Sequence, residues 1–454
     1  MPDHFPNLTW QADVWSEGRR ILDESIGAYL QTRKRGFVFE AVGMIAKASG
    51  LLASVGDLCH VYSTAGSGEV AVGTGEVVGF TGDATLIMLH QGIAGLRRNC
   101  EIGGSGSALS VGVGTELLGR VLDGMGEPID GKGPLVTAER RPVFVPAPQP
   151  MARDPIHLPF QTSIKAIDAF ATMGRGQRLG VFAPAGAGKS TLIGMLARGA
   201  NADLNVIALI GERGREVMEF IEQSLGESGM ARSVVICSTS DRSPLERSRC
   251  AFVAMTIAEY MRDRGADVLL VMDSLTRFAR AQREIGLAVG EPPTRRGYPP
   301  SLFQELPRLL ERAGNANGGT ITSLFTVLEE GSDDSDPVGE EVRSLIDGHI
   351  ILSKDLAAKG QYPPIDIKRS LSRVMNMVTT REHQRVATRL KSFLAKYEEI
   401  EFLLQVGEYR EGVDPLADAA CEHQGQVVEF LKQSSDEIVP LEASLEWISG
   451  WAEV

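Results

Sequence analysis

The sequence predicts an α/β protein with a small N-terminal β-barrel, a central doubly wound parallel sheet and a helical C-terminal domain. Residues 36–96 contain short apolar runs that are separated by Gly, Ser or Asp, which is typical of a small barrel. Between residues 179 and 351, apolar strand-like runs alternate with helical stretches, as in a doubly wound sheet. After residue 378 the strand signals end and only helical periodicity remains.

Length and composition indicate a globular chain of several domains. With 454 residues, and about 150 residues for an average domain, we expect two or three domains. Hydrophobic residues make up 43% of the chain, which excludes disorder on a large scale. Lys and Arg number 46 and Asp and Glu number 59, and the resulting net charge of −13 argues against a nucleic-acid partner.

The cysteines and the N-terminus indicate a cytoplasmic protein. The five cysteines are scattered, and no CxxC pair suggests zinc or dithiol chemistry. The start, MPDHFPNLTWQADVW, has neither a basic region nor a continuous apolar core, and no later run reaches the roughly 18 apolar residues of a membrane span. We therefore expect neither export through a signal peptide nor a transmembrane segment.

Three domains are expected along the chain, at residues 1–97, 98–377 and 378–454. The first begins with a helix over residues 8–31, followed by the basic cluster at residues 33–35. This helix either packs on its own barrel beside a solvated charge cluster, or docks on a membrane surface or a partner. The second begins with a linker rich in Gly, Asp and Pro.

A glycine-rich segment, APAGAGKST over Ala183–Thr191, follows the strand-like run RLGVF. Gly186 and Gly188 allow backbone N–H groups to surround phosphate oxygens at the start of a helix. Lys189 would then reach the outer phosphates of a nucleotide, and the Ser190 hydroxyl would bind Mg²⁺, which takes one or two protein oxygens. The segment predicts nucleotide binding, and the alternative is a chance glycine-rich turn.

The run DVLLVMD has the pattern of a buried strand that ends in an acid, Asp273. An acid at this place in a P-loop enzyme holds magnesium. The alternative is a helix N-cap, because the following SLTRFAR has helical character. We expect Asp273 to be the second acidic group of the site.

A second strand-like run, NVIALIG, leads into Glu212 and Arg213. A carboxylate at the end of a strand in this sheet could orient or deprotonate a water that attacks the γ-phosphate, which makes Glu212 the candidate general base. The alternative is a first-turn glutamate that complements the dipole of the next helix. Arg277, four residues after Asp273, is a candidate for balancing phosphate charge, and a surface ion pair is its alternative.

Longer stretches resemble one particular family. They are GRGQRLGVFAPAGAGKSTLIGMLAR, IGERGREV, the run from Thr239 to Gly314, and DGHIILS, in this order. The chain resembles the ATPases of bacterial type III secretion systems, which are related to the catalytic subunit of rotary ATP synthases. The resemblance covers nearly the whole chain and implies a RecA-like central domain and an enzyme that hydrolyses ATP with Mg²⁺.

The resemblance assigns a role to each matching residue. Lys189 and Ser190 contact phosphates and magnesium, Glu212 activates water, Arg213 and Arg277 lie near the γ-phosphate, and Asp273 holds magnesium. It adds Tyr362, in GQYPPID, as the aromatic that stacks on adenine, and Arg373, in SLSRVM, as an arginine finger inserted into a neighbouring subunit. The complete nucleotide-binding set that it implies is Gly186, Ala187, Gly188, Lys189, Ser190, Thr191 and Tyr362.

An oligomer follows from the placement of Glu212 and Arg373 on one chain, because identical copies can then complete each other's sites. A head-to-tail interface repeats until it closes, and the resemblance implies a hexameric ring. It also implies secretion chaperones, effector cargo, and stalk and stator proteins of the export apparatus as partners. The expected place is the cytoplasm, at the inner face of the bacterial inner membrane, with peripheral membrane contact left open.

Two departures and several alternatives accompany this resemblance. Thr162 and Ser163 stand where the family usually has Thr-Gly, and Ala183 stands where the strict phosphate-loop pattern has Gly. The segments EEVRSLIDGHI and MVTTREHQR favour the virulence or symbiosis branch over the flagellar export branch. The alternatives are the flagellar export ATPase, an RNA-translocating ring, and a subunit that holds nucleotide without hydrolysing it.

Overall fold

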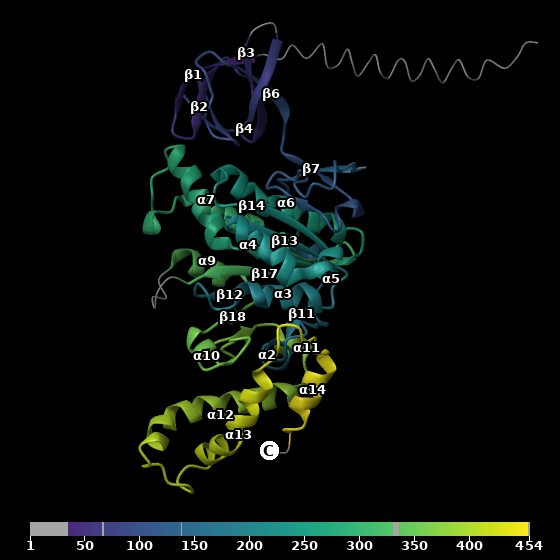
Figure 1. Cartoon of the computed structure of the whole chain (residues 1–454), viewed down its shortest axis with the longest axis vertical. Coiled ribbons are helices and arrows are strands. Elements are labelled where there is room, and N and C mark those ends of the chain that lie inside the picture. Colours follow the sequence, from purple (N-terminus) through teal and green to yellow (C-terminus); the bar gives the residue numbers. More distant parts are fainter. Residues whose placement is uncertain (1–34, 66–67, 138, 330–335, 453–454) are drawn as a thin grey trace, which may run out of the picture. The chain divides into compact units, whose positions relative to one another are not determined.

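The computed structural model describes residues 35–65, 68–137, 139–329 and 336–452, which fall into two compact units, Met1–Ser107 and Ala108–Val454. The helix expected over residues 8–31 lies outside the described residues, as do Arg33 and Lys34 of the basic cluster. The first unit contains the expected barrel, and the second contains a central sheet and the C-terminal helices (Figure 1). Among the described residues, every helix is too short or too polar to cross a bilayer.

The first unit is a closed barrel of six strands in the order β1-β2-β5-β4-β3-β6. The strands are β1 (Arg35–Val42), β2 (Ile45–Ser49), β3 (Asp57–Ala65), β4 (Gly68–Thr81), β5 (Ala84–Leu89) and β6 (Glu101–Ala108). Pairing of β1 with β6 closes the barrel, and the boundary expected at residue 97 falls before this last strand. The sequence of β6, EIGGSGSA, hides the strand because it is mostly Gly and Ser and has a single β-branched residue.

Alternate side chains from the six strands fill the barrel interior, where Val38, Val61, Val77 and Ile87 are buried in one cluster. The strands approach one another closely inside this cluster. A Cβ on Gly75 would lie 2.7 Å from the carbonyl oxygen of Met88, so only glycine fits at this point of β4.

The second unit is built on a nine-stranded sheet in the order β19-β18-β12-β17-β15-β13-β14-β8, with β16 paired to β17. The inner strands β12, β17, β15, β13 and β14 are parallel. The strands are β8 (Val121–Leu122), β12 (Arg178–Ala183), β13 (Leu204–Ile210), β14 (Ser233–Ser238), β15 (Asp267–Asp273), β16 (Gly314–Ala316), β17 (Gly319–Leu328), β18 (Gly348–Ile351) and β19 (Leu371–Ser372). The expected doubly wound parallel sheet is therefore confirmed.

Helices cover both faces of this sheet, which explains why its strands read as continuous apolar runs. On one face, α3 packs its Leu192 and Leu196 into the cluster that contains Val271 of β15. On the other face, α6 contacts β13, β14 and β15. The helices are α3 (Lys189–Gly199), α4 (Gly214–Glu219), the π-helical turn η3 (Phe220–Leu225), α5 (Gly226–Ala231), α6 (Pro244–Arg262), α7 (Leu275–Ala288), α8 (Pro300–Leu310), α9 (Pro337–Leu345) and α10 (Lys354–Ala358).

The segment between barrel and sheet is mostly turns, as expected, but it also adds short pieces of structure. These are β7 (Ser110–Val113), η1 (Thr115–Leu117), β9 (Glu139–Pro142), η2 (Pro150–Ala152), β10 (Pro159–Phe160), α2 (Lys165–Phe170) and β11 (Met173–Gly174). Within the segment expected to be linker, Val121 and Leu122 form β8, an edge strand of the central sheet.

The C-terminal helices are α11 (Met375–Val378), α12 (Arg381–Gln405), α13 (Pro415–Leu431) and α14 (Leu441–Ser449). They pack on α2 and belong to the same compact unit as the sheet. At this interface the rings of Phe430 and Trp447 stack at 3.7 Å between centroids, and Phe170 lies edge-on to both. The helical nature of this region is confirmed, whereas its boundary at residue 378 stays a prediction.

Candidate active site

The glycine-rich segment lies between β12 and α3, the strand–loop–helix context that phosphate binding requires. Gly186 and Gly188 have φ angles of +80° and +81°, a conformation that side chains with a Cβ rarely adopt. Lys189 is the first residue of α3, so the first N–H groups of this helix face the end of the loop. Ala183 is the last residue of the buried strand β12, so it lies before the loop rather than within it.

Lys189 brings the two candidate acids together. Its Nζ contacts Oδ1 of Asp273 and lies 3.7 Å from Oε1 of Glu212. The side chain of Lys189 is 11% exposed, so these ion pairs are shielded from water. Lys189 at the start of α3, Glu212 after β13 and Asp273 at the end of β15 therefore lie together in one cluster.

Asp273 is held at the end of β15 by hydrogen bonds rather than by a role as a helix cap. The hydroxyl of Thr326 on β17 donates to its Oδ1 at 2.8 Å, and Lys189 donates to the same oxygen. The residue that precedes α7 is Ser274, and its side chain makes no capping bond. The N-cap alternative for Asp273 is therefore wrong.

Glu212 follows β13 and precedes α4, whose first turn contains Glu216 instead. The alternative of a first-turn glutamate is therefore wrong for this residue. Arg277 forms an ion pair with Oε2 of Glu212 and donates to the Gly211 carbonyl oxygen at 2.9 Å, which fixes the carboxylate at the strand end. This contact places Arg277 in the cluster, and the alternative of a surface ion pair fails.

The surroundings of Glu212 favour its protonated form. Burial is the main cause that raises the pKa of this carboxyl, and the negative charge of Asp273 adds to it. Arg277 and Lys189 oppose the rise without cancelling it. A carboxylate with a raised pKa is the stronger base, which suits proton removal from water.

A small pocket lies beside this cluster, between the start of α3 and the segment α4–η3. Ser190, Glu212 and Asp273 line it together with Glu216 and Gln223. In the described part of the chain, no group of three or more His, Cys, Asp or Glu side chains forms a protein cage for a metal ion. One hydroxyl and one carboxylate nevertheless fit Mg²⁺, because this ion retains most of its water ligands.

Arg213 does not join the cluster. Its side chain is 75% exposed and pairs with Glu216 at 3.2 Å. Arg213 is the N-cap residue of α4, and its extended backbone directs the chain from the strand end into the helix. The structure therefore gives no support within one chain to its expected place near the γ-phosphate.

Tyr362 and Arg373 lie in different places relative to the phosphate loop. Tyr362 is 56% exposed, and Pro364 of the same loop lies 3.9 Å from where a Cβ on Gly188 would stand, so this loop borders the phosphate loop. Arg373 is exposed beside β19, and its described hydrogen bonds are with Asp347 and Arg343. It contacts neither Lys189 nor Glu212 of its own chain among the described residues.

Sequence reasoning missed Thr326, which holds Asp273. The register explains the contact, because Met272 of β15 pairs with Phe325 of β17 and places Thr326 beside Asp273. A signal was present, since Thr326 is a hydroxyl residue inside the apolar end of GTITSLFTVL. Pairing of β15 with β17, which are separated by α7 and α8, was needed to read that signal.

Comparison with known proteins identifies the family. Residues 163–372 match the ATP synthase alpha/beta family, nucleotide-binding domain, and residues 379–449 match the T3SS EscN ATPase C-terminal domain. The chain is 52% identical to a type 3 secretion system ATPase of Xanthomonas euvesicatoria, over 94% of this chain and 96% of the relative. The chain belongs to the family of type 3 secretion system ATPases. It is an ATP-hydrolysing enzyme.

Two further relatives show how the type 3 secretion system ATPases connect to other proteins. A flagellum-specific ATP synthase of Bacillus subtilis is 45% identical over 91% of this chain and 94% of the relative. A solved structure, the assembled ATPase EscN in complex with its central stalk EscO from enteropathogenic E. coli, superimposes with a TM-score of 0.84 at 42% identity, over 92% of this chain and 100% of that chain. The fold class and the family expected from the sequence are both confirmed.

Proposed function

We propose that this chain energises protein export by a non-flagellar type III secretion system through Mg²⁺-dependent hydrolysis of ATP. The observation that carries the proposal is the cluster in which Lys189 contacts both Asp273 and Glu212 beside a glycine-rich loop, in a chain of this ATPase family. Hydrolysis would drive the release of chaperones and the unfolding of effector cargo at the export apparatus.

Each side chain has a role that its position supports. The N–H groups of the loop and Lys189 bind the β- and γ-phosphates, and Lys189 leaves its two carboxylate partners when it does so. Ser190 and Asp273 would hold Mg²⁺, which neutralises charge on the phosphates when bound. Thr326 fixes the Asp273 carboxylate by its hydrogen bond, so that group is oriented before the nucleotide arrives.

Glu212 acts as the base. Its carboxylate orients a water molecule toward the γ-phosphate and takes a proton as the new P–O bond forms, while the bond from the γ-phosphorus to the β–γ bridging oxygen breaks and ADP leaves. Arg277 holds this carboxylate through the contact at Oε2, which leaves Oε1 near Lys189. We assign Arg277 to positioning of the base and to charge balance near the γ-phosphate. Arg213 stays a candidate for the γ-phosphate region, although its side chain is exposed within one chain.

We infer that the ring of identical subunits, six by family resemblance, completes the site. Arg373 is exposed, and its described hydrogen bonds are with Asp347 and Arg343 rather than with the phosphate loop, as expected of a finger that acts on a neighbour. Tyr362 is exposed at the edge of the loop next to Gly188, where an adenine ring could stack on it.

The remaining partners follow from the family. EscN was solved as an assembled ATPase with its central stalk EscO, and we propose that this chain also binds a stalk protein. Secretion chaperones, effector cargo and a stator are further proposed partners, with peripheral contact to the inner face of the bacterial inner membrane from a cytoplasmic position. The net charge of −13 disfavours an RNA-translocating ring.

A second candidate function is flagellar protein export, which the relative from Bacillus subtilis favours. The active sites of the two would be the same, so the partner proteins must discriminate between them. The test is pull-down of purified full-length chain with chaperones of each system from the same bacterium. Retention of flagellar chaperones alone would transfer the function to flagellar export.

Steady-state ATP hydrolysis, measured against protein concentration with light scattering on the same samples, tests the ring. A finger in trans contributes ~10³- to 10⁵-fold to the rate in P-loop systems, so specific activity should rise as rings form. Equal specific activity from a proven monomer would contradict the shared site.

A further inference from the structure

Gln433, two residues after the end of α13, joins three separate segments of the second unit. Its side chain is 5% exposed. Oε1 accepts a hydrogen bond from the backbone N–H of Lys165 at 2.9 Å, and Nε2 donates to the carbonyl oxygens of Ser163 and Glu437, both at 2.8 Å. Its own backbone N–H donates to the carbonyl oxygen of Tyr362 at 2.8 Å.

These four hydrogen bonds tie the loop that carries Tyr362 to the start of α2. The carboxamide satisfies the N–H of Lys165, which is the first residue of α2 and has no partner inside its own helix. Loss of the carboxamide would leave the N–H of Lys165 and the carbonyl oxygens of Ser163 and Glu437 without this partner, and the bond to Ser163 is buried, so its loss destabilises the arrangement. The arrangement therefore fixes where residue 433 and the Tyr362 carbonyl group stand.

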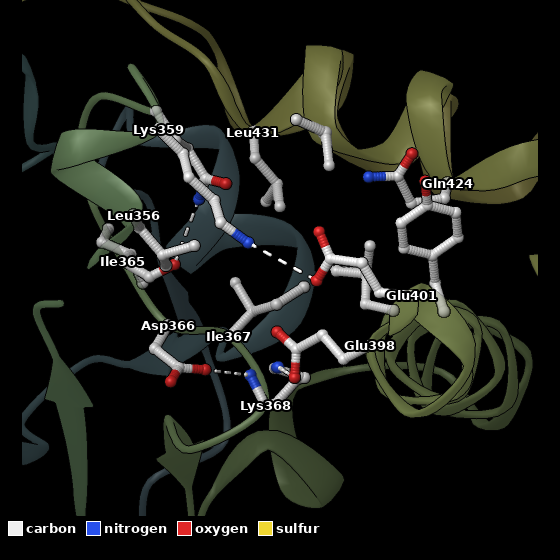
Figure 2. A pocket seen from close by; sticks show the side chains of 14 residues that line it. Leu356, Lys359, Ile365, Asp366, Ile367, Lys368, Glu398, Glu401, Gln424 and Leu431 are labelled. Carbon is white, nitrogen blue, oxygen red and sulfur yellow. Dashed lines mark hydrogen bonds and ion pairs between the residues drawn. The ribbon is translucent and has the colours of Figure 1, made fainter. Parts of the chain in front are cut away.

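The loop also packs on the C-terminal helices, because Ile365 and Ile367 share a buried cluster with Leu390 of α12. Beneath the loop, Ile365, Leu394 and Leu431 line a cavity of about 310 Å³, so packing there is incomplete (Figure 2). Across it run the ion pairs Lys359–Glu401, at 3.8 Å, and Lys368–Glu398. Half-exposed ion pairs of this kind contribute little to stability. Compared with these ion pairs, the hydrogen bonds of Gln433 are less exposed to water, and they directly involve the backbone of Tyr362.

We propose that Gln433 is a positioning residue that holds the Tyr362 loop in place and thereby sets the affinity of the site for the base of the nucleotide. The loop reaches the phosphate loop as well, through Pro364 beside Gly188, but the groups that bind phosphate are held by α3 and the sheet. Loss of the Gln433 contacts should therefore weaken binding of the base, through the position of Tyr362, and leave binding of the phosphates unchanged. This inference rests on the proposed function, in which Tyr362 stacks on adenine.

The variant Gln433→Glu keeps the size of the side chain and removes its donor. One carboxylate oxygen can still accept from Lys165, whereas the other faces the carbonyl oxygens of Ser163 and Glu437, which repel it. We expect the affinity for ATP to fall by about tenfold and the affinity for inorganic tripolyphosphate, which has no base, to stay within about twofold. Both are measured by calorimetry on the full chain.

A second pair of variants tests the same contact without changing Gln433. Lys165 occupies the first helical position, where proline is tolerated, and Ile164 before it is extended, as a residue before proline prefers to be. Lys165→Pro removes the N–H that Oε1 accepts, and Lys165→Ala is the matched control that loses only the side chain. Lys165→Pro should bind ATP about threefold more weakly than Lys165→Ala, with equal affinity for tripolyphosphate.

Reference variants separate the possible failures. Tyr362→Ala should lower the ratio of ATP to tripolyphosphate affinity. Gln384→Ala should not, because the described hydrogen bonds of this α12 side chain are with Thr379, just before its own helix. If Tyr362→Ala leaves the ratio unchanged, the assigned base site fails. If Tyr362→Ala lowers it but Gln433→Glu does not, or weakens both ligands equally, the inference about Gln433 is overturned.

Discussion

At the scale of single residues, the site is an ion-pair cluster in which each acid has a different environment. Asp273 accepts hydrogen bonds from Lys189 and Thr326, whereas Glu212 accepts from Arg277 and lies farther from Lys189. Burial and the charge of Asp273 raise the pKa of Glu212. Because their environments differ, the two carboxylates can have different roles under the proposed function, Asp273 as a ligand for the metal ion and Glu212 as the base.

Replacement of Glu212 by Gln should separate binding from turnover. The amide keeps the volume of the side chain but cannot take a proton, so we expect hydrolysis to fall by about 10²- to 10⁴-fold with ATP affinity little changed. Single-turnover hydrolysis and calorimetry on the same preparation measure the two effects. Glu227→Gln, an exposed carboxylate on α5, is the control. Hydrolysis at the wild-type rate in Glu212→Gln would remove this residue from the mechanism.

Removal of Arg277 should change the pH dependence of hydrolysis. Glu212 must be deprotonated to act as the base, so activity is lost as the pH falls through its pKa. Arg277 lowers that pKa, and without it the pKa rises further. In Arg277→Gln the acid limb of the pH–rate profile should therefore move to higher pH. Arg283→Gln on the same helix should leave the limb in place, and an unmoved limb in both would contradict the pairing.

At the scale of elements, the turn before α2 shows how one departure from the family pattern is accommodated. Ser163 stands where the family usually has Gly, and its φ of +62° is costly for a residue with a Cβ. In compensation, its hydroxyl donates to the Gly199 carbonyl oxygen at 2.7 Å and accepts from Gln161 at 3.0 Å. The buried carboxylate of Asp168 accepts from both N–H groups of the turn.

Substitutions at Ser163 should reveal this balance. Ser163→Gly relieves the left-handed conformation but loses the hydroxyl and adds chain entropy to the unfolded state, so the free energy of unfolding should change by less than about 1 kcal/mol. Ser163→Ala keeps the conformation and loses the hydrogen bonds, so it should be less stable than both by about 1 kcal/mol. Urea unfolding of the three proteins gives the order, and an alanine variant as stable as wild type would contradict it.

The elements also show which features a sequence can predict. The phosphate loop, Asp273 and Glu212 were predictable because each follows its own strand directly, and their meaning depends on a short stretch of chain. Strand β6 was missed because its Gly and Ser residues gain their strand character from pairing with β1. Arg213 was placed near the γ-phosphate by the family resemblance alone, and within one chain it is the N-cap residue of α4 with an exposed side chain. The role of Gln433 could not be predicted from its neighbours in the sequence, because two of its hydrogen-bond partners lie 268 and 270 residues away.

At the scale of the whole molecule, the proposed function divides the site between two chains. Glu212 and Arg373 belong to the same polypeptide, yet Arg373 contacts neither Lys189 nor Glu212 among the described residues. A neighbour in a ring supplies the missing cation under the proposed function. The catalytic unit is then the interface between two subunits, and the fold of a single chain provides half of it on each side.

Mixing two inactive variants tests this arrangement. Arg373→Ala should assemble yet hydrolyse poorly, and Glu212→Gln should be inactive for a different reason. In rings formed from equal amounts of both, about one interface in four combines an intact Glu212 with an intact Arg373, so about a quarter of wild-type activity should return. Mixed rings that stay as inactive as either parent would show that Arg373 acts within its own chain.

The bonds of Gln433 also bear on how the protein is made. Lys165 and Ser163 meet this side chain 268 and 270 residues further along the sequence. A chain emerging from the ribosome can form its barrel and its parallel sheet first, because domains fold in the order of synthesis. The Tyr362 loop, by contrast, receives its anchor only near the end of translation. A nascent chain that lacks Gln433 would therefore bind nucleotide more weakly than the complete chain. Incomplete copies would hydrolyse little ATP before the C-terminal segment is made.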